Sequence, residues 1–465
     1  MNNSILPNGW VLAQYQDIYL SASNGVGGTQ NKEGKGLPVS RIETIANESV
    51  DYERIGYIAI YDEKKVEKHR LMAGDILFSH INSPVHLGKT AIYDGKHQLF
   101  HGINLLRIVV DLRLILPSIL NYHCKYIRAL GDFSAEAQHA VNQSSLNQKK
   151  LGSFNISLPP LAEQKIIADK LDDLLARVES IKTRLENIPE ILKKFRQSVL
   201  SAAVKGKLTR EWRIYNRESL SLEEYKTSLG NFRSKAKGLK PIIKKESWLS
   251  CQLGHVISVS SGNSLTAKEM TPDSNIPVYG GNGINGYHDQ SNVTESKVVI
   301  GRVGFYCGSV HLTENISWVT DNALIVDFPE DILIKNFVFW LLSATNLRED
   351  SASSAQPVIS GTKIYPIPLQ IPPVAEQLEI VRIIEEHVTF ANRIEHSTQA
   401  ALNRVNKLTQ SILAKAFRGE LTAQWREENP ELISGLNSAE ALLEKITAEK
   451  LASGTIKKRT KKASN

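Results

Sequence analysis

Apolar side chains recur along two long stretches of the chain at steps that alternate between four and three residues. In the first stretch they are Ile167, Leu171, Leu174, Val178, Ile181, Leu185, Ile188, Leu192, Phe195 and Val199. The same positions of the second stretch hold Ile380, Ile384, His387, Ala391, Ile394, Thr398, Ala401, Val405, Leu408 and Ile412. This spacing is typical of a coiled-coil seam rather than of the broader stripe of a helix on a globular core. The pattern therefore predicts two long helices, the second with the weaker seam.

The same two motifs enclose each predicted helix. Residues 159–164 are Pro-Pro-Leu-Ala-Glu-Gln, residues 372–377 are Pro-Pro-Val-Ala-Glu-Gln, and both helices close on Gly-x-Leu-Thr-x-x-Trp-Arg, ending at Arg213 and Arg426. The offset is 372 − 159 = 213 at the start and 426 − 213 = 213 at the end, so the two copies have equal length. A seam that is apolar on one side needs a partner, and the nearest candidate is the other copy. The alternative is two unrelated surface helices.

Proline also marks where the helices start and where the first is expected to be disturbed. Pro-Pro suits a first helical turn, and the acidic residue that follows favours the positive end of the helix dipole. Pro189 interrupts the first helix, whereas Leu402 stands at its place in the second. We therefore predict a kink or break near Asn187. The uninterrupted part, from Leu161 to Asn187, would span about 40 Å at roughly 1.5 Å per residue.

Two variable blocks of mixed strand and helix pattern precede the two helices. Short apolar runs bounded by turn residues predict strands at 71–79, 104–110, 298–304 and 323–326, and 122–130 has a helical pattern. Near the end of the second block, Gln356 and Ile359 follow Gln143 and Leu146 by 213 residues, so the blocks share a plan. We predict an α+β protein with mixed α/β blocks at 1–158 and 246–371, long-helix repeats at 159–213 and 372–426, a charged linker at 214–245 with a short helix, and a C-terminal segment at 427–465. This alternation is the organisation of a bivalent binder.

Charge and cysteine content narrow the class of partner and compartment. The formal charge is +7 and the pI about 9.0, which admits a polyanionic partner without requiring one. Much of the excess lies in a basic tail at 457–462. The three cysteines are far apart and have no metal-ligand spacing, so no metal site and a reducing, cytoplasmic setting are expected. The start of the chain lacks the pattern of a signal peptide, and the most apolar run, 105–120, contains charged residues, so no membrane span is expected.

Three short motifs resemble catalytic or cofactor sites but lack the context that such sites need. Residues 281–286, Gly-Asn-Gly-Ile-Asn-Gly, match the dinucleotide fingerprint, yet the polar residues that follow predict no helix. Gly88-Lys89-Thr90 lacks the first glycine of a phosphate loop, and Pro84 lies inside the would-be cradle. Asp273 with Glu295 and Lys297 has the letters of a nuclease core, which recur by chance. The sequence contains no convincing catalytic machinery, and enzyme remains the weaker class.

The repeated Pro-Pro-Leu/Val-Ala-Glu-Gln and Gly-x-Leu-Thr-x-x-Trp-Arg motifs resemble those of the specificity subunit (HsdS) of type I restriction-modification enzymes. The segment 410–426, Gln-Ser-Ile-Leu-Ala-Lys-Ala-Phe-Arg-Gly-Glu-Leu-Thr-Ala-Gln-Trp-Arg, is very similar to the enterobacterial, K-type branch (type IA). The resemblance covers the full length, because both blocks and both repeats follow the order of the family. It implies two target-recognition domains, each reading one half of a bipartite asymmetric DNA site. It also implies an intramolecular antiparallel coiled coil, with pseudo-twofold symmetry, that sets the spacer.

The same resemblance implies partners and cofactors that this chain does not hold itself. Two modification (methyltransferase) subunits would bind S-adenosylmethionine and methylate adenine at N6, and two restriction subunits would use ATP and Mg to cleave DNA. The specificity subunit itself is expected to have no active site and no cofactor. A DNA-independent coiled-coil scaffold and a stand-alone DNA-modifying enzyme are the alternatives. A pull-down combined with a gel shift separates the three classes.

Candidate site residues follow from the chemistry of DNA recognition and from the repeats. Side chains with hydrogen-bond donors and acceptors on loops can reach base edges, whereas other lysines and arginines contact phosphates. For DNA binding we select Arg41, Ser79, His80, Asn82, Lys89, Gln143, Asn282, Asn285, His288, Arg302, Asn322 and Gln356. Two identical partners need two equivalent surfaces, so for partner binding we select Glu163, Gln164, Trp212, Glu376, Gln377 and Trp425. An ordinary polar loop residue, or a helix-packing role for the tryptophans, is an equal alternative at each position.

Overall fold

The computed structural model describes residues 6–60, 62–84, 86–140, 143–216, 222–232, 234–245, 247–348 and 358–454 of the chain. The chain divides into two compact units. Unit 1 comprises Met1–Leu185 together with Ala401–Asn465, and unit 2 comprises Glu186–Ala400. Each unit therefore contains one of the two predicted blocks and one part of each long helix.

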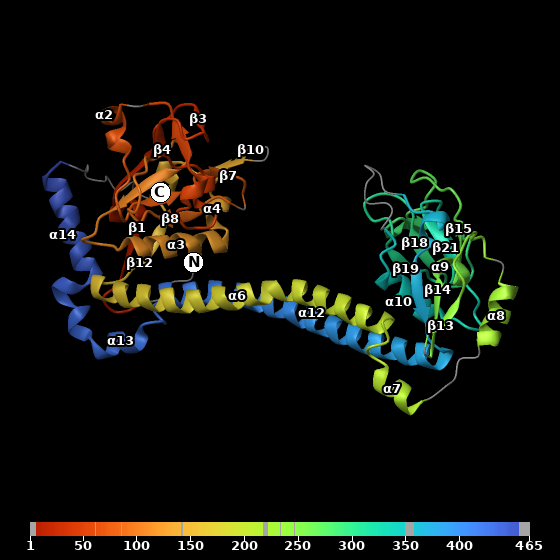
Figure 1. Ribbon diagram of the computed structural model, residues 1–465. Coiled ribbons are helices and arrows are strands. Elements are labelled where there is room, and N and C mark those ends of the chain that lie inside the picture. Colours follow the sequence, from red (N-terminus) through yellow and green to blue (C-terminus); the bar gives the residue numbers. More distant parts are fainter. Residues whose placement is uncertain are drawn as a thin grey trace. The chain divides into compact units, whose positions relative to one another are not determined.

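Two helices of equal length dominate the chain, as the repeated motifs predict. Helix α6 (Leu161–Val204) and helix α12 (Val374–Phe417) each have 44 residues, or about 66 Å at 1.5 Å per residue (Figure 1). Of the kink or break that the sequence predicts near Asn187, the break is wrong because α6 continues through Pro189, and the kink stays a prediction. The ring of Pro189 lies on an exposed face of the helix, where water can bind the carbonyl that loses its backbone donor.

Within each unit the two long helices run antiparallel. In unit 1 the start of α6 lies along the end of α12, since Ile167 shares a core with Ala416 and Lys170 Nζ donates to the carbonyl of Leu421 over 3.1 Å. In unit 2 the end of α6 lies along the start of α12, where Arg196 bonds to Glu395 over 2.6 Å. The predicted pairing of the two copies is confirmed in each unit.

The heptad seam is buried over most of its predicted length. Seam residues that are less than 10% exposed are Ile167, Leu171, Val178, Leu192, Val199, Ile380, Ile384, Ala391, Thr398, Val405 and Ile412. Ile181 and Leu408 are exceptions, with 47% and 46% of their surface exposed. His387, one of the polar seam residues, packs its ring edge-on against Phe195 at a centroid distance of 5.8 Å. The weaker second seam is thus completed by an aromatic contact from the first.

The block of unit 1 is built from short strands and short helices. Its strands are β1 (Val11–Gln14), β2 (Tyr19–Asn24), β3 (Gln30–Asn31), β4 (Leu37–Val39), β5 (Gly56–Ile58), β6 (Ile76–Phe78), β7 (Ile81–Asn82), β8 (Thr90–Ile92), β9 (Leu106–Val110), β10 (Gln138–Ala140), β11 (Gln143–Ser145) and β12 (Asn155–Leu158). Its helices are α1 (Tyr15–Ile18), α2 (Glu63–Val66), α3 (Pro117–Leu130), α4 (Asp132–Ala135) and α5 (Gln148–Gly152), and the C-terminal segment adds α13 (Ala423–Glu428) and α14 (Ala439–Ala452). The predicted strands at 71–79 and 104–110 correspond to β6 and β9.

The block of unit 2 contains strands β13 (Ile243–Lys245), β14 (Trp248–Gln252), β15 (Ser258–Ser261), β16 (Ile276–Gly280), β17 (Gly283–His288), β18 (Val298–Gly301), β19 (Val310–Leu312), β20 (Trp318–Val319), β21 (Ala323–Asp327) and β22 (Pro368–Ile371). Its helices are α9 (Leu253–Val256), α10 (Lys335–Ala344) and α11 (Gly361–Ile364), and α7 (Arg210–Tyr215) and α8 (Leu222–Asn231) precede it. Helix α8 is the short helix that the sequence predicts in the linker.

Local sequence explains where these elements begin and end. Strands β6 and β18 are the uninterrupted apolar runs Ile-Leu-Phe and Val-Val-Ile-Gly, and every residue of both is buried. Such runs are typical of strands covered on both faces. Helix α3 has Pro117 in its first turn and is followed directly by Gly131, whose φ of +83° suits glycine.

The two blocks share one sheet plan. The four-stranded sheet of unit 1 has the order β2-β9-β6-β8, and that of unit 2 has the order β15-β21-β18-β19. In each unit a strand at the start of the block also pairs antiparallel with the strand that precedes the long helix, β1 with β12 and β14 with β22. A mixed helix and sheet fold with two blocks of similar plan is therefore confirmed.

Each block packs directly on the paired helices of its own unit. In unit 1 a single core contains Ile76 and Phe78 of the sheet together with Leu171 of α6 and Phe417 of α12. In unit 2 the core joins the sheet to Val199 and Ile380 in the same way. Because one continuous core links block and helices, each block is held firmly on its own part of the helical pair.

Candidate functional site

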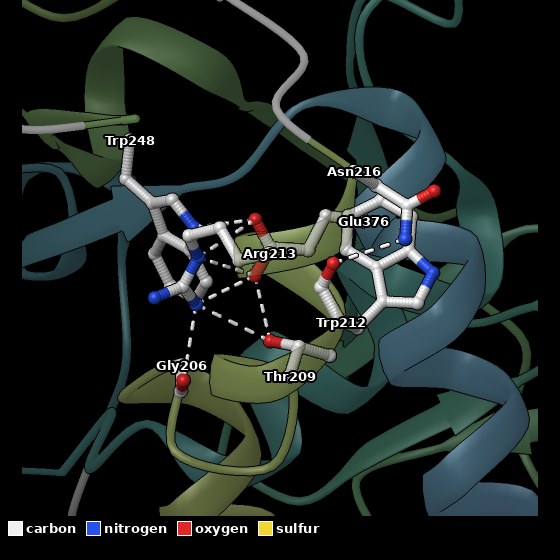
Figure 2. Close-up of polar contacts among 7 residues, drawn as sticks. All are labelled: Gly206, Thr209, Trp212, Arg213, Asn216, Trp248 and Glu376. Atoms are coloured by element: carbon white, nitrogen blue, oxygen red, sulfur yellow. Dashed lines mark hydrogen bonds and ion pairs between the residues drawn. The ribbon is translucent and has the colours of Figure 1, made fainter.

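A buried carboxylate joins the block of unit 2 to both long helices. Glu376 lies in the first turn of α12 and is 1% exposed. Its Oε2 accepts from the indole Nε1 of Trp248 at 2.8 Å, and its Oε1 accepts from the hydroxyl of Thr209 and from Nη2 of Arg213, both at 2.6 Å. Figure 2 shows these donors converging on the carboxylate. We call Trp248, Glu376, Thr209 and Arg213 joint 2.

The repeated glycine and threonine explain how the end of α6 reaches Glu376. Gly206 has a φ of +67°, and a Cβ there would lie 2.6 Å from Nη2 of Arg213 and 2.9 Å from the ring of Trp248. Arg213 also donates to the carbonyl of Gly206 over 3.0 Å, which closes the turn. Thr209 directly precedes α7 and does not cap it with its side chain, so its hydroxyl can donate to Glu376. The motif Gly-x-Leu-Thr-x-x-Trp-Arg is therefore the sequence of one compact turn.

Unit 1 contains the same arrangement, which we call joint 1. Oε2 of Glu163 accepts from the indole of Trp10 at 2.7 Å, and Oε1 accepts from Thr422 at 2.5 Å and from Arg426. Gly419, with a φ of +76°, takes the place of Gly206. Both carboxylates are almost completely buried, and an arginine and a threonine from the other repeat neutralise and solvate each one. Each joint thus fixes the start of one long helix to the end of the other.

The glutamine after each buried glutamate ties the block to the start of the helix. Gln164 Nε2 donates to the carbonyls of Leu114 and Pro159 at 2.8 and 2.9 Å, and its Oε1 accepts from the backbone N–H of Leu116 at 2.8 Å. Gln377 makes the same three bonds, with Ile332 at 2.9 Å, Pro372 at 3.0 Å and Ile334 at 3.0 Å. Both amides are fully buried, so the start of α3 and the start of α10 are held by equivalent bonds.

The structure therefore gives internal roles to four of the six residues selected for partner binding. Glu163, Gln164, Glu376 and Gln377 are buried and use their polar atoms inside the chain. Trp212 and Trp425 are half-buried and lie on the short helices α7 and α13. Beside Trp212, Tyr215 is 87% exposed. Partner binding in this region stays a prediction, and it now rests on Trp212, Trp425 and their exposed neighbours.

In the first block the DNA-binding candidates are spread over several elements. Ser79, His80 and Asn82 lie together at the end of β6 and in β7, where Asn82 Nδ2 donates to Ser79 Oγ over 3.1 Å. Arg41 pairs with Glu43 at 2.8 Å beside a separate hollow of about 540 Å³. Lys89 Nζ donates to the carbonyl of Ala46 over 2.7 Å. Gln143 lies in β11, whose next residue pairs with Asn82 of β7.

In the second block the candidates lie around the hairpin β16–β17 and the end of β18. Asn282 occupies the exposed turn of the hairpin, and Asn285 is exposed on β17. Arg302 is half-buried and its backbone N–H donates to the carbonyl of Asn322 over 2.9 Å. His288 lies edge-on to the ring of Trp318, with a centroid distance of 5.3 Å. Gln356 lies outside the described residues.

The motifs set aside in the sequence have ordinary structural roles. Residues 281–286 form the turn between β16 and β17 and the first part of β17. A strand, and not the helix that a dinucleotide site needs, therefore begins at Gly283. Gly88 and Lys89 lead into strand β8 in the same way. Lys297 bonds to Glu295 at 2.6 Å just before β18.

Burial changes the protonation of the histidine nearest to these candidates. It lowers the pKa of His80 to about 4, so this imidazole is neutral at pH 7. The amide Nδ2 of Asn24 lies 3.2 Å from its Nε2, and an NH₂ group can only donate, so Nε2 accepts this hydrogen bond. Within the described ranges, no three His, Cys, Asp or Glu side chains lie close enough to hold a metal ion. No helix of the described chain is long and apolar enough to cross a membrane.

Sequence reasoning missed residues that the structure brings to these sites. Of the donors of the joints, Thr209, Thr422, Arg213 and Arg426 stand in the closing motif but are not selected, and Trp10 and Trp248 lie outside both repeated motifs. The signal was present, since threonine and arginine recur at the same offset as the glutamates. Asn24 and Ser261, which contact His80 and Arg302, give only a weak signal in the sequence, a polar residue followed by glycine in the first part of each block.

Comparison with known families and proteins gives one consistent result. The family model described as type I restriction modification DNA specificity domain matches residues 9–190 and 245–404. The type I restriction enzyme EcoKI specificity subunit of Escherichia coli (strain K12) is 34% identical over 490 residues, covering 100% of both chains. The EcoDI specificity subunit of Escherichia coli is 42% identical over 329 residues, which cover 67% of this chain and 72% of that protein.

Solved structures with the same fold point the same way. A chain from a structure on complex assembly and conformational transition of the type I R-M system aligns with a TM-score of 0.65 at 15% identity, covering 90% of this chain and 100% of that chain. The HsdS subunit from Thermoanaerobacter tengcongensis aligns with a TM-score of 0.54 at 15% identity, covering 90% of this chain and 99% of that one. At this identity the likeness concerns the fold alone.

Proposed function

The chain belongs to the family of type I restriction-modification DNA specificity subunits, and we propose that each of its two blocks reads one half of a bipartite, asymmetric DNA site. The observation that carries this proposal is the repeated joint. A tryptophan at the start of each block bonds to the glutamate that opens a long helix, and the other repeat supplies threonine and arginine. Equal attachment of two blocks that differ in sequence suits two readers of different half-sites.

The paired helices set the distance between the half-sites in this proposal. Both helices have 44 residues, and they run antiparallel within each unit. Successive sites on one face of B-DNA recur about every 34 Å, so readers attached to helices of this length suit half-sites separated by a non-specific spacer. The helix length then fixes the spacer.

The partners follow from the duplicated surfaces. Two modification subunits dock at two equivalent places, for which Trp212 and Trp425 are the anchors, and two restriction subunits complete the complex. S-adenosylmethionine, ATP and Mg belong to these partners, and this chain contributes recognition without chemistry. The proposed location is the cytoplasm, where the complex meets double-stranded DNA.

Mapping of methylated adenines tests the proposal directly. The full chain is produced with its modification subunits, and N6-methyladenine is mapped over a bacterial genome. The expected result is methylation at two short half-sites with a constant spacer. Methylation without a bipartite site, or by this chain alone, supports a stand-alone enzyme, and absence of DNA binding with a bound partner supports a scaffold. Either result contradicts the proposal.

The role of the helices is tested by a heptad insertion. Seven residues are inserted after Leu185 and after Thr398, which are repeat-equivalent seam positions (398 − 185 = 213). The insertion lengthens each helix by about 10 Å, so the preferred spacer should grow by about three base pairs at roughly 3.4 Å per base pair. Seven residues inserted after Gly238, where no atom lies within 4 Å of an added Cβ, serve as the control. An unchanged spacer in the helix variant removes the ruler from the proposal.

A further inference from the structure

The loop that follows β6 in the first block is fixed by three backbone bonds. The N–H of Ser79 donates to the carbonyl of Lys89 over 2.8 Å, and the N–H of Gly88 donates back to Ser79 over 2.8 Å. The carbonyl of His80, the first residue of the loop, accepts from Leu146 over 2.8 Å. The base of this loop is therefore a rigid part of the sheet.

The loop that follows β18 in the second block is fixed by the same three bonds. Gly301 donates to Ser309 over 2.8 Å, and Gly308 donates back to Gly301 over 2.7 Å. The carbonyl of Arg302 accepts from Ile359 over 2.8 Å. His80 and Arg302 therefore occupy the same place on a common scaffold, although neither the loops nor the residues themselves are alike.

The neighbouring strand supplies an equivalent side chain to each of them. Asn24 ends β2 and pairs with Leu106 of β9, while Ser261 ends β15 and pairs with Leu324 of β21. The next residue is glycine in both blocks, and a Cβ there would meet a backbone carbonyl at 2.0 Å on Gly25 and at 2.2 Å on Gly262. The two strand ends are thus held in the same close approach to the adjoining loop.

In each block the side chain at the strand end bonds to the side chain at the loop base. Nδ2 of Asn24 lies 3.2 Å from Nε2 of His80, and Nη1 of Arg302 lies 3.3 Å from the hydroxyl of Ser261. We call Asn24 with His80 strand-end pair 1, and Ser261 with Arg302 strand-end pair 2. The two pairs have the same position and the same kind of contact, but they consist of different residues. Two domains that read different DNA sequences require this combination.

Resting on the proposed function, we propose that each strand-end pair contacts one base pair at the equivalent position of its half-site, and that this base pair is read as adenine by pair 1 and as guanine by pair 2. Asn24 and Ser261 are exposed, whereas His80 is 6% exposed. In pair 1 the outer amide is therefore the reader and His80 the positioning residue. In pair 2 the half-buried Arg302 is the reader and Ser261 positions its guanidinium.

The chemistry of the two readers sets the base preference. An asparagine or glutamine amide presents one donor and one acceptor, which match N6 and N7 of adenine, whereas arginine presents two donors, which match O6 and N7 of guanine. In the first block Gln148 Nε2 donates to Oδ1 of Asn24 over 2.8 Å, so a second amide adjoins the reader. Both amides and His80 line an open hollow of about 570 Å³. His80 is neutral at pH 7, because burial lowers its pKa to about 4, so it adds no charge that would favour a phosphate over a base.

The test uses substitutions at the two readers, in the full chain assembled with its modification subunits. Asn24→Asp keeps the size of the side chain but replaces the donor by an acceptor, and Arg302→Ala removes the guanidinium. Binding is measured with synthetic duplexes in which each position of the half-sites is randomised. Asn24→Asp should lose about tenfold to a hundredfold of its preference for adenine at one position of the first half-site. Arg302→Ala should lose a similar preference for guanine in the second half-site only.

Positioning roles are tested by substitutions that leave the reader in place. Ser261→Ala should reduce the guanine preference by less than Arg302→Ala, and Ser261→Thr, which keeps the hydroxyl, should restore it. A purely structural role of Ser261 would change the overall affinity but not the preference at one base pair. Asn155→Asp, on the exposed side of β12, applies the same chemical change to the same block as a matched control and should leave both half-sites unchanged.

The outcomes separate this inference from the proposed function. The complex without substitutions is expected to show two half-sites. If it does, but Asn24→Asp and Arg302→Ala both leave every base preference intact, the strand-end pairs are not readers and the proposed function still stands. If the unmodified complex shows no bipartite site, the proposed function itself fails. A change of preference in the half-site assigned to the other pair also overturns the inference.

Discussion

Arg213 donates from Nη2 to Oε1 of Glu376 at 2.6 Å, although 163 residues separate the two along the chain. In the other joint Arg426 donates to Glu163 across 263 residues. The same contact is therefore reached through two different separations in sequence. Its geometry depends on the antiparallel pairing of the repeats within each unit, because the two separations differ by the parts of both long-helix repeats that lie between glutamate and arginine.

Removing the charge at the centre of a joint should destabilise the unit that contains it. Glu376→Gln leaves the half-buried Arg213 without its carboxylate and removes one acceptor from the Trp248 and Thr209 donors. We expect a loss of about 2–4 kcal/mol in the free energy of unfolding, measured as a shift of the urea midpoint of the full chain. Glu163→Gln should behave similarly in unit 1.

A surface glutamate provides the comparison for these variants. Glu386 bonds to Arg382 at 3.1 Å, and its side chain is 69% exposed. Glu386→Gln should change the free energy of unfolding by less than about 0.5 kcal/mol, because an exposed ion pair contributes little. Equal effects of Glu386→Gln and Glu376→Gln would mean that the joint contributes no more to stability than a surface pair.

The glycine that ends α6 should tolerate no side chain. Gly206→Ala forces a positive φ of +67° on alanine and puts its Cβ 2.6 Å from Nη2 of Arg213. A cost of about 1–3 kcal/mol is expected from the backbone strain and the displaced guanidinium. Gly230→Ala, in α8, has no atom within 4 Å of its Cβ and should be neutral or slightly stabilising. Thermal unfolding of the two variants decides between these outcomes.

Substitution of a buried glutamine should destabilise the chain by leaving main-chain groups without hydrogen-bond partners. Gln377→Leu keeps the volume but leaves the carbonyl of Ile332 and the N–H of Ile334 without their partner. Each unsatisfied buried group costs about 1–3 kcal/mol, so the variant should unfold at a clearly lower urea concentration. Gln424→Leu, where the amide donates at the surface to Glu428 over 2.9 Å, should unfold like the unmodified chain. Hydrogen exchange at Ile334 should also accelerate in Gln377→Leu alone.

Stability should fall as the pH drops below neutral, and His123 contributes to this loss. Its ring is buried, bonds to the hydroxyl of Tyr15 at 2.7 Å and lies edge-on to Phe417. Burial lowers the pKa of His123 to about 3, whereas the unfolded value is about 6.5. The native state therefore stays neutral while the unfolded state takes up a proton. The stabilising effect of the neutral ring is complete above about pH 6.5 and is lost progressively as the pH falls towards the folded pKa.

At pH 5 this single group should have lowered the free energy of unfolding by about 2 kcal/mol. Urea unfolding at pH 7 and pH 5 gives the difference for the unmodified chain and for His123→Gln, and the variant should lose about 2 kcal/mol less between the two values. His396, exposed on α12, provides the control, since His396→Gln should leave the pH dependence unchanged. An equal pH dependence of all three chains would exclude His123 as a source of the acid lability.

The sequence predicts the repeats well because their signals are periodic or duplicated. The seam, the offset of 213 residues and the glycine of each closing motif are visible without a structure. The prediction of a break near Asn187 is wrong, because a rule for isolated helices ignores the seam contacts on both sides and the exposed position of the Pro189 ring. The roles of Glu163 and Glu376 were also invisible, because burial of a carboxylate depends on donors that lie far away in the chain.

The candidates for base contact show what the sequence could not predict. His80 and Arg302 could be selected as polar residues after apolar strands, but their equivalence could not, since the surrounding loops differ in length and sequence. It emerges only from the backbone bonds that Ser79 and Gly301 make. Asn24 and Ser261 acquire meaning through those bonds and through the strand register. Single polar residues at strand ends are too common for a pattern to distinguish them.

The bonds of Gln164 and Gln377 to their blocks all end on main-chain atoms. A main-chain carbonyl is present in every residue, and a main-chain N–H in every residue except proline. The side chains just before α3 and α10 can therefore change by mutation while the hydrogen bonds that attach each block to its helix remain. New recognition surfaces can then evolve on a block whose attachment is unchanged.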